Sequence, residues 1–228
     1  MKKNLLLLAM LFGAMFTFTA CGGDDDDDNG GGGGGATYED SRITSVIPDT
    51  YLKQLAKHMS IYDGVTPPTI EGRYVMAPTK LLYDSNGWNG GDTSWADNYF
   101  TFSNQSSSNR TVAVSQTTNS GYSGSGTGAY ICGKNNNFTI YFNETGVSYG
   151  INYKQAVIIS GVKTSSGIRN LTKAFVMVER GEKTGDTDIM KVGEYRIFTD
   201  EDGMSDPAQS SSAKGAAVTG QFASMNVQ

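Results

Sequence analysis

The most constraining feature is the pattern of residues from Thr69 onward. Short runs of β-branched and aromatic residues alternate there with clusters of Gly, Asn, Ser and Asp. This pattern is typical of an all-β domain, because the first group favours strands and the second favours turns. Connections this short join neighbouring antiparallel strands. We therefore predict an antiparallel, up-and-down meander of about eight strands.

Alternation of apolar residues indicates which side chains share a face. Phe138, Ile140 and Phe142 fall on one face of a strand. Two runs, 156–159 and 174–178, are apolar on both faces, which is typical of central strands that are covered on their outer side. The expected strands are 70–77, 80–83, 98–103, 111–117, 128–132, 138–142, 155–162, 174–179 and 194–198.

One segment before the strands has helical spacing. Pro48 suits a first helical turn, and Leu52, Leu55 and Met59 fall on one face. The pattern predicts a short amphipathic helix over about 47–59. We expect its apolar face to cover the outer side of the two central strands.

The start of the chain has the order of a secretory signal. Lys2 and Lys3 are followed by an apolar run over 5–18 and by two small residues directly before Cys21. The run is shorter than the roughly 20 residues of a membrane-spanning helix. Residues 22–35 are Gly, Asp and Asn alone, and such a tract cannot bury apolar surface. The predicted organisation is a signal peptide over 1–20, a flexible tether over 21–36, a single domain over 37–204 and a low-complexity tail over 205–228.

This opening resembles a lipoprotein signal, in which the cysteine receives diacylglycerol. Phe18 and Thr19 depart from the usual Leu and Ser or Ala of that signal, whereas Cys21 is in place. The acidic run 24–28 resembles the export signal of Bacteroidales-type surface lipoproteins. The resemblance implies lipidation of Cys21 and an outer-membrane location, exposed at the cell surface or otherwise facing the periplasm. Two or more acyl chains hold a protein stably on a membrane.

The order of the strands resembles a calycin-type barrel, the architecture of lipocalins and avidins. The resemblance covers about 69–202 and includes Gly72 and Tyr74 early in the first strand. Tyr74 stands where the lipocalin signature has Trp, which leaves the ligand class open. A two-sheet β-sandwich is the alternative fold. An eight-stranded barrel is wide enough for packed side chains or one small ligand.

Composition limits the classes of partner. The net charge is -5, and the run 24–28 alone contributes five negative charges. The sequence has no basic patch of the kind that neutralises phosphates, so nucleic acid is not an expected partner. We expect the chain to bind the membrane through lipid on Cys21. The sequence does not specify a protein partner.

The sequence carries no recognisable catalytic or metal-binding motif. His58 is the single histidine, and Cys132 would be left without a disulfide partner if Cys21 is acylated. We expect Cys132 to be a small buried hydrophobe. The loop 84–92 has Asp and Asn but no Glu to complete a calcium loop. The prediction is a protein that is not an enzyme, with no cofactor and no metal.

Candidate binding residues come from two places. Trp88, Trp95 and Tyr99 are aromatic residues in or near one loop, and Phe142 and Tyr195 are expected inside the barrel. The leading hypothesis is a barrel that binds a small apolar or amphipathic ligand, unless bulky residues fill its interior. The alternatives are a glycan-binding accessory lipoprotein that uses the Trp88 loop, and a structural or assembly lipoprotein with a protein partner.

Overall fold

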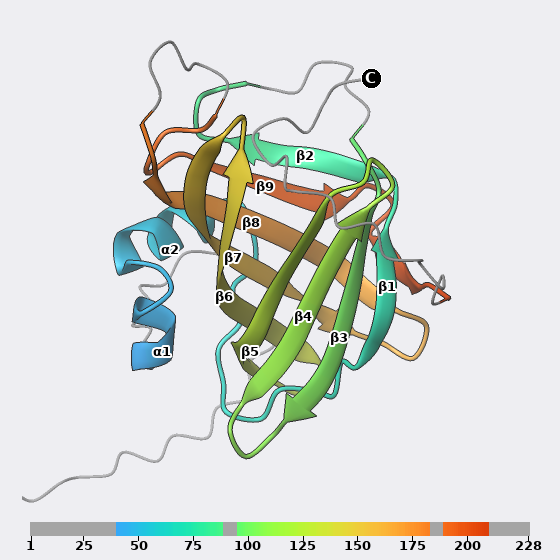
Figure 1. Ribbon diagram of the computed structural model, residues 1–228. Helices are drawn as coiled ribbons and strands as arrows, with labels where there is room; N and C mark the ends of the chain where they lie inside the picture. The colour runs from blue at the N-terminus through green and yellow to red at the C-terminus, as the bar shows by residue number, and fades with distance from the viewer. Residues whose placement is uncertain (1–39, 89–94, 183–188, 210–228) are drawn as a thin grey trace, which may run out of the picture. The chain divides into compact units, whose positions relative to one another are not determined.

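The computed structural model describes residues 40–88, 95–182 and 189–209, which belong to one compact unit. Strands make up most of it, and two short helices precede them (Figure 1). The elements are α1 (Ser41–Thr44), α2 (Asp49–Leu55), β1 (Gly72–Met76), β2 (Thr79–Asp84), β3 (Asn98–Ser106), β4 (Thr111–Thr118), β5 (Ser123–Lys134), β6 (Asn137–Ser148), β7 (Ile151–Lys163), β8 (Ile168–Arg180), β9 (Tyr195–Asp200) and β10 (Met204–Pro207).

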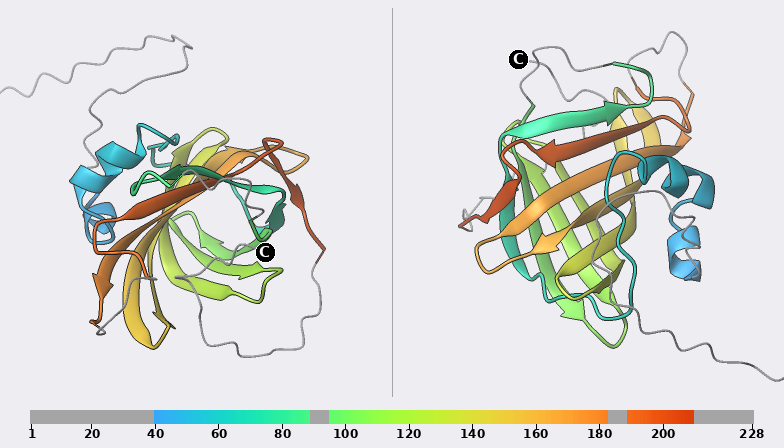
Figure 2. Two further views of the ribbon diagram at one scale, coloured as in Figure 1. Left: turned by 90° about the horizontal axis from the view of Figure 1, so that it is seen from above. Right: turned by 180° about the vertical axis from the view of Figure 1, so that it is seen from behind.

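The strands form one antiparallel sheet that closes into a ring. Each of β3 to β8 pairs with the next strand in the sequence. β1 pairs with β3 and with β10, while β2 pairs with β9, and both β9 and β10 pair with β8. Only Ala77 and Pro78 separate β1 from β2, and only residues 201–203 separate β9 from β10. The two short strands β1 and β2 therefore act together as one strand of the barrel, and so do β9 and β10. With β3 to β8 the barrel has eight strand positions, and Figure 2 shows it end-on.

This ring confirms the predicted all-β meander and favours the barrel over the sandwich. In a closed sheet, alternate residues of each strand face the interior. Phe138, Ile140 and Phe142 on β6 do so, as their spacing predicted. They belong to a buried interior cluster that also includes Tyr74, Met76, Phe100, Phe102, Val112, Val114, Ile131, Val157, Ile159, Leu171, Phe175, Met177 and Phe198.

Inward-facing glycines make room for the largest interior side chains. A Cβ at Gly126 would lie 2.3 Å from the ring of Phe142, and one at Gly146 would lie 2.4 Å from the hydroxyl of Tyr153. These glycines are strand residues, although glycine is depleted in strands. Because the sequence pattern counted glycine against strands, it predicted only 128–132 and 138–142, whereas β5 and β6 extend further.

The two helices cover part of the outer face, as expected. Ile47, Leu52 and Leu55 are fully buried there. Figures 1 and 2 show the helices outside the ring, beside β6, β7 and β8. The outer cluster continues on the strands with Tyr130, Cys132, Tyr141, Ala156, Ile158, Ala174, Val176 and Ile197. The double-sided apolar runs on β7 and β8 are therefore explained by one core inside the barrel and another under the helices.

Two predicted boundaries were wrong. The single helix over 47–59 is replaced by α1, which Asp40 caps by accepting a hydrogen bond from the backbone N–H of Arg42 (3.0 Å), and by the shorter α2. The tail was predicted from residue 205, but β10 extends to Pro207. Ser205 is buried and donates to Asp200 Oδ2 (2.8 Å). Nothing apolar in Ser-Asp-Pro marks this segment as a strand.

We predict that Phe142→Ala lowers the free energy of unfolding by about 3 to 5 kcal/mol, because it deletes a buried ring and leaves a cavity. Phe142 is 4% exposed, whereas Val147 on the same strand is 42% exposed. Val147→Ala is the matched control and should change stability by no more than about 0.5 kcal/mol. Urea denaturation of both variants measures this, and equal losses would contradict the packing described above.

Candidate ligand site at one end of the barrel

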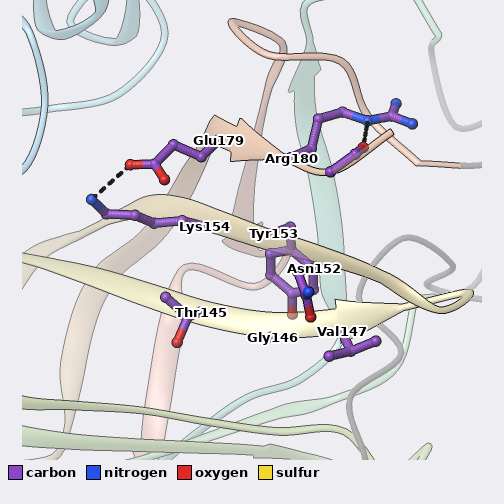
Figure 3. Close-up of a pocket in the computed structure, with 9 residues that line it drawn as sticks. Thr145, Gly146, Val147, Asn152, Tyr153, Lys154, Glu179 and Arg180 are labelled. Carbon is purple, nitrogen blue, oxygen red and sulfur yellow. Dashed lines mark hydrogen bonds and ion pairs between the residues drawn. The ribbon is translucent and has the colours of Figure 1, made fainter. Parts of the chain in front are cut away.

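A hollow of about 560 Å³ lies where β6 ends, β7 begins and β8 ends (Figure 3). It opens to solvent, and its lining combines apolar and charged groups. The Lys154 ammonium pairs with the Glu179 carboxylate at 3.1 Å across β7 and β8. The lining residues are Thr145, Gly146, Val147, Asn152, Tyr153, Lys154, Glu179, Arg180 and Gly181.

Cross-strand pairing fixes the floor of the hollow. Gly146 is the register partner of Tyr153, and Tyr153 is the partner of Arg180. Gly146 has no side chain, so the Tyr153 ring packs over it and is only 4% exposed. The Arg180 guanidinium donates to the carbonyl of Ile189 at 2.9 Å, which ties the segment before β9 to this rim. The hollow is therefore built on paired strands, with a bulge in the pairing of β7 with β8 between Lys154 and Gln155.

Behind the hollow, the barrel interior becomes polar. Glu144 on β6 and Gln155 on β7 are register partners, and both are buried. The Tyr122 hydroxyl, just before β5, donates to Glu144 Oε1. Lys173 on β8 is also buried, with its ammonium 5.9 Å from the centre of the Tyr122 ring. Together with buried Gln116 on β4, we call these five residues the polar layer.

The polar layer continues around the ring because one inner position carries no side chain. Gln116 is the register partner of Gly124. A Cβ at Gly124 would lie 2.0 Å from the Tyr122 hydroxyl and 2.6 Å from Glu144 Oε2. Tyr122 and Glu144 thus occupy the space over Gly124, next to Gln116. Any larger residue at position 124 would displace them.

Burial determines the protonation behaviour of the polar layer. Burial raises the pKa of Glu144. The positive charge of Lys173 and the hydrogen bonds from the Tyr122 hydroxyl and the Gln155 amide lower that pKa, but less than burial raises it. Burial lowers the pKa of Lys173 to about 8, and the charge of Glu144 partly opposes this. Burial also raises the pKa of Tyr122 far above its usual range. Opposite charges held in a dry interior are costly, and here the charges of Glu144 and Lys173 partly offset that cost.

Tyr153 joins the hollow to the polar layer. It lines the hollow, and its pKa is raised by burial and by the charge of Glu144. Gln155, two residues further along β7, faces the interior from the same side of the strand. Tyr153 therefore belongs both to the lining of the hollow and to the surroundings of Glu144.

The three aromatic residues of the predicted binding loop do not share one surface. Trp88 is 38% exposed, meets Trp95 edge to face at 5.4 Å and has the Arg196 guanidinium over its ring at 5.3 Å. Trp95 is buried in the interior cluster. Tyr99 lies on the outer face of β3, with Arg73 over its ring at 4.6 Å. The wall of the barrel therefore separates Trp95 from Tyr99.

The two residues expected inside the barrel differ in position. Phe142 faces the interior, as predicted. Tyr195 does not: it lies in the outer cluster, stacked on Tyr83 at 5.5 Å. The reason is that Ile197 and Phe198 are both apolar, so the sequence alone does not show which face of β9 is inward. Phe198 takes the inner side, which places Tyr195 with Ile197 outside.

Cys132 and His58 are both occupied in packing. The prediction that Cys132 is a buried hydrophobe is confirmed: its thiol donates to the carbonyl of Tyr62 at 3.3 Å, and burial raises its pKa to about 12. His58 stacks on Tyr83 with ring centres 3.7 Å apart. Cys21 and residues 89–92 lie outside the described residues.

No protein-family model matches the chain, and neither a curated protein nor a solved structure matches it. Among the residues that the structure describes, no group of three or more His, Cys, Asp or Glu side chains could hold a metal ion. No helix in the described ranges is long and apolar enough to cross a membrane.

The sequence analysis missed the polar layer, although a signal was present. Lys173 stands at the same parity as Leu171, Phe175 and Met177, all of which face inward. Glu144 likewise continues the series of Phe138, Ile140 and Phe142. Extending the alternation through charged residues would have placed both side chains inside the barrel.

The lowered pKa of Lys173 makes stability depend on pH. Lysine in an unfolded chain has a pKa of about 10.4, so between pH 8 and that value the unfolded chain holds a proton that folded Lys173 has released. The contribution of Lys173 to the free energy of unfolding should therefore rise with pH in this range, by up to about 1.4 kcal/mol per pH unit.

We predict that Lys173→Met removes this rise. Urea denaturation across a pH series should show that, above pH 8, the free energy of unfolding rises with pH more steeply for the wild type than for the variant. Lys80 is exposed and serves as the control, because Lys80→Met should leave the pH dependence as in the wild type. Parallel curves for the wild type and Lys173→Met would contradict the burial of this ammonium.

Proposed function

We propose that the barrel is a binding module that takes one small amphipathic molecule at the end formed by β6, β7 and β8. The hollow there carries this proposal, because its volume of about 560 Å³ falls in the range of small-molecule sites. Tyr153 and Val147 offer apolar surface, while Lys154, Glu179 and Arg180 offer charged groups. An apolar tail and a polar head would each find matching surface.

The proposal places this binding module on a lipid tether at the outer membrane. The supporting observation is the order of charged start, apolar run and small residues before Cys21, followed by the acidic run 24–28. The tether would act as a flexible coil, which lets the barrel move relative to the membrane. A cell-surface position is the proposed location, with the periplasmic face as its alternative.

We propose binding without catalysis. Nucleophilic catalysis needs a nucleophile within hydrogen-bond reach of a base. Cys132 is buried with a raised pKa, and His58 is stacked on Tyr83. Neither residue has the environment of an activated group. The hollow is lined instead by residues suited to holding a molecule in place.

Native mass spectrometry of the full chain tests the proposal. The chain should carry Cys21→Ser, so that attached acyl chains do not obscure a bound molecule, and should be purified from its own cells without detergent. We predict a discrete added mass that disappears on denaturation. Gly181 lines the hollow and a Cβ there would meet its nearest neighbour at 3.6 Å, so Gly181→Phe should fill the hollow and abolish the added mass.

Ser165 provides the control, because it is exposed in the turn between β7 and β8 at the opposite end of the barrel. Ser165→Phe adds the same ring and should keep the added mass. An added mass that persists in Gly181→Phe would place binding elsewhere. The absence of any discrete added mass in all three proteins would count against a binding module.

A further inference from the structure

We propose that the polar head of the bound molecule is an uncharged group that carries one or more hydroxyls, and that the Lys154–Glu179 ion pair binds it. This inference rests on the proposed function and names the chemical class of its ligand. The whole molecule stays in the hollow on the outer face of β6, β7 and β8, so its head needs no passage into the barrel.

The side chains that would hold this head form a row across three strands. On β6, Phe142 and Glu144 are buried on the inner side, so Thr145 lies on the outer face. Thr145 is the register partner of Lys154 on β7, and Lys154 is the partner of Glu179 on β8. Neighbouring strands lie about 4.8 Å apart, so the row places a hydroxyl, an ammonium and a carboxylate side by side. All three residues of the row line the hollow.

The ion pair can bind a hydroxyl without breaking. Lys154 Nζ and Glu179 Oε1 are 3.1 Å apart, and the two side chains are 35% and 70% exposed. An ammonium has three donors and a carboxylate has two acceptor oxygens, so this contact does not use them all. A hydroxyl can therefore accept a hydrogen bond from Lys154 and donate one to Glu179 at the same time. Both hydrogen bonds would involve a charged partner, which makes them stronger than bonds between neutral groups.

The charges around the hollow favour an uncharged head. A carboxylate beside Lys154 would also lie beside the Glu179 carboxylate, and an ammonium beside Glu179 would lie beside Lys154, so attraction and repulsion largely cancel. The third charged group, the Arg180 guanidinium, donates to the carbonyls of Ile189 (2.9 Å) and Gly181 (3.3 Å). Figure 3 shows it directed away from the ion pair. A charged head would therefore lose hydration without gaining an unmatched partner.

The apolar part of the molecule has a surface next to this row. Val147 and Asn152 are register partners and form the next row on the same face, two residues along each strand. Val147 is 42% exposed. Figure 3 shows the side chains of Val147 and Thr145 on one side of β6. An alkyl chain that packs on Val147 would therefore lead directly to the row that binds the hydroxyl.

Probes with one alkyl chain and different heads test this inference. The full chain with Cys21→Ser is titrated with n-octanol, octyl glucoside, 1-methoxyoctane, octanoate and octylammonium, and chemical shifts in nuclear magnetic resonance spectra give each Kd. The ether head of 1-methoxyoctane accepts hydrogen bonds but cannot donate them. We expect n-octanol and octyl glucoside to bind about tenfold more tightly than the other three, the ratio that corresponds to roughly one net hydrogen bond. Tighter binding of octyl glucoside than of n-octanol would identify a sugar head, and equal binding a simple alcohol.

Variants of the ion pair locate the hydroxyl. Glu179→Leu removes the acceptor and should bring n-octanol and 1-methoxyoctane to nearly equal Kd. Glu179→Lys places two ammonium groups in the row and should make octanoate the tightest of the five probes. Lys80 and Glu201 form an exposed ion pair of the same length, 3.1 Å, and neither residue lines the hollow. Glu201→Leu is therefore the matched control and should keep the wild-type ratios.

The outcomes separate the two proposals. Equal Kd values for all five probes would overturn the inference and leave the binding module standing. The same conclusion would follow from a preference for n-octanol over 1-methoxyoctane that Glu179→Leu leaves intact, or from a charged probe that binds the wild type more tightly than n-octanol. Binding of none of the five probes would contradict the proposed function, and the inference with it.

Discussion

Closure of the sheet is the constraint on which the rest of the structure depends. It is made by two short pairings, β1 with β10 and β2 with β9, which join the first and last strands of the meander. Because a closed ring has an inside, each strand must divide its side chains between two environments. The buried polar layer exists only because closure removes these positions from water. The helices then cover the outer face where β7 and β8 remain apolar.

The interior has two parts with different physical roles. Around Phe102, Phe138 and Ile131 it is a packed apolar core. Toward the hollow it holds Glu144 and Lys173, which a stable core alone does not require, since matched apolar residues are usually at least as stabilising as a buried ion pair. Gly124 leaves the space that Tyr122 and Glu144 occupy. Titratable groups with shifted pKa values cluster at functional sites, and the hollow next to this part of the interior is the basis of the proposed site.

Much of the fold could be predicted from the sequence, because alternation is a property of neighbouring residues. The spacing of Phe138, Ile140 and Phe142 predicted the inner face of β6, and the apolar runs on β7 and β8 predicted the cover by the helix. What could not be predicted depends on distant pairing. β10 has a single apolar residue, Met204, and becomes a strand through its pairing with β1 and β8. Ile197 and Phe198 lie on opposite faces of β9 and both are apolar, so only closure of the barrel determines that Tyr195 faces outward.

The candidate site was less predictable for the same reason. Glu144, Gln155 and Lys173 come from three strands, and only the register of β6, β7 and β8 brings them toward one space. Charged residues in a strand are ordinarily assigned to solvent, which hid Lys173. The aromatic residues that stand out in the sequence, Trp88 and Trp95, instead pack against each other and against Phe198.

A crystal structure of the full chain with Cys21→Ser, grown with n-octanol, tests the central claim most directly. The account predicts the alcohol bound in the hollow, with its alkyl chain against Val147 and its oxygen near Lys154 and Glu179. A hollow without the alcohol, with the alcohol bound elsewhere or absent, would contradict it.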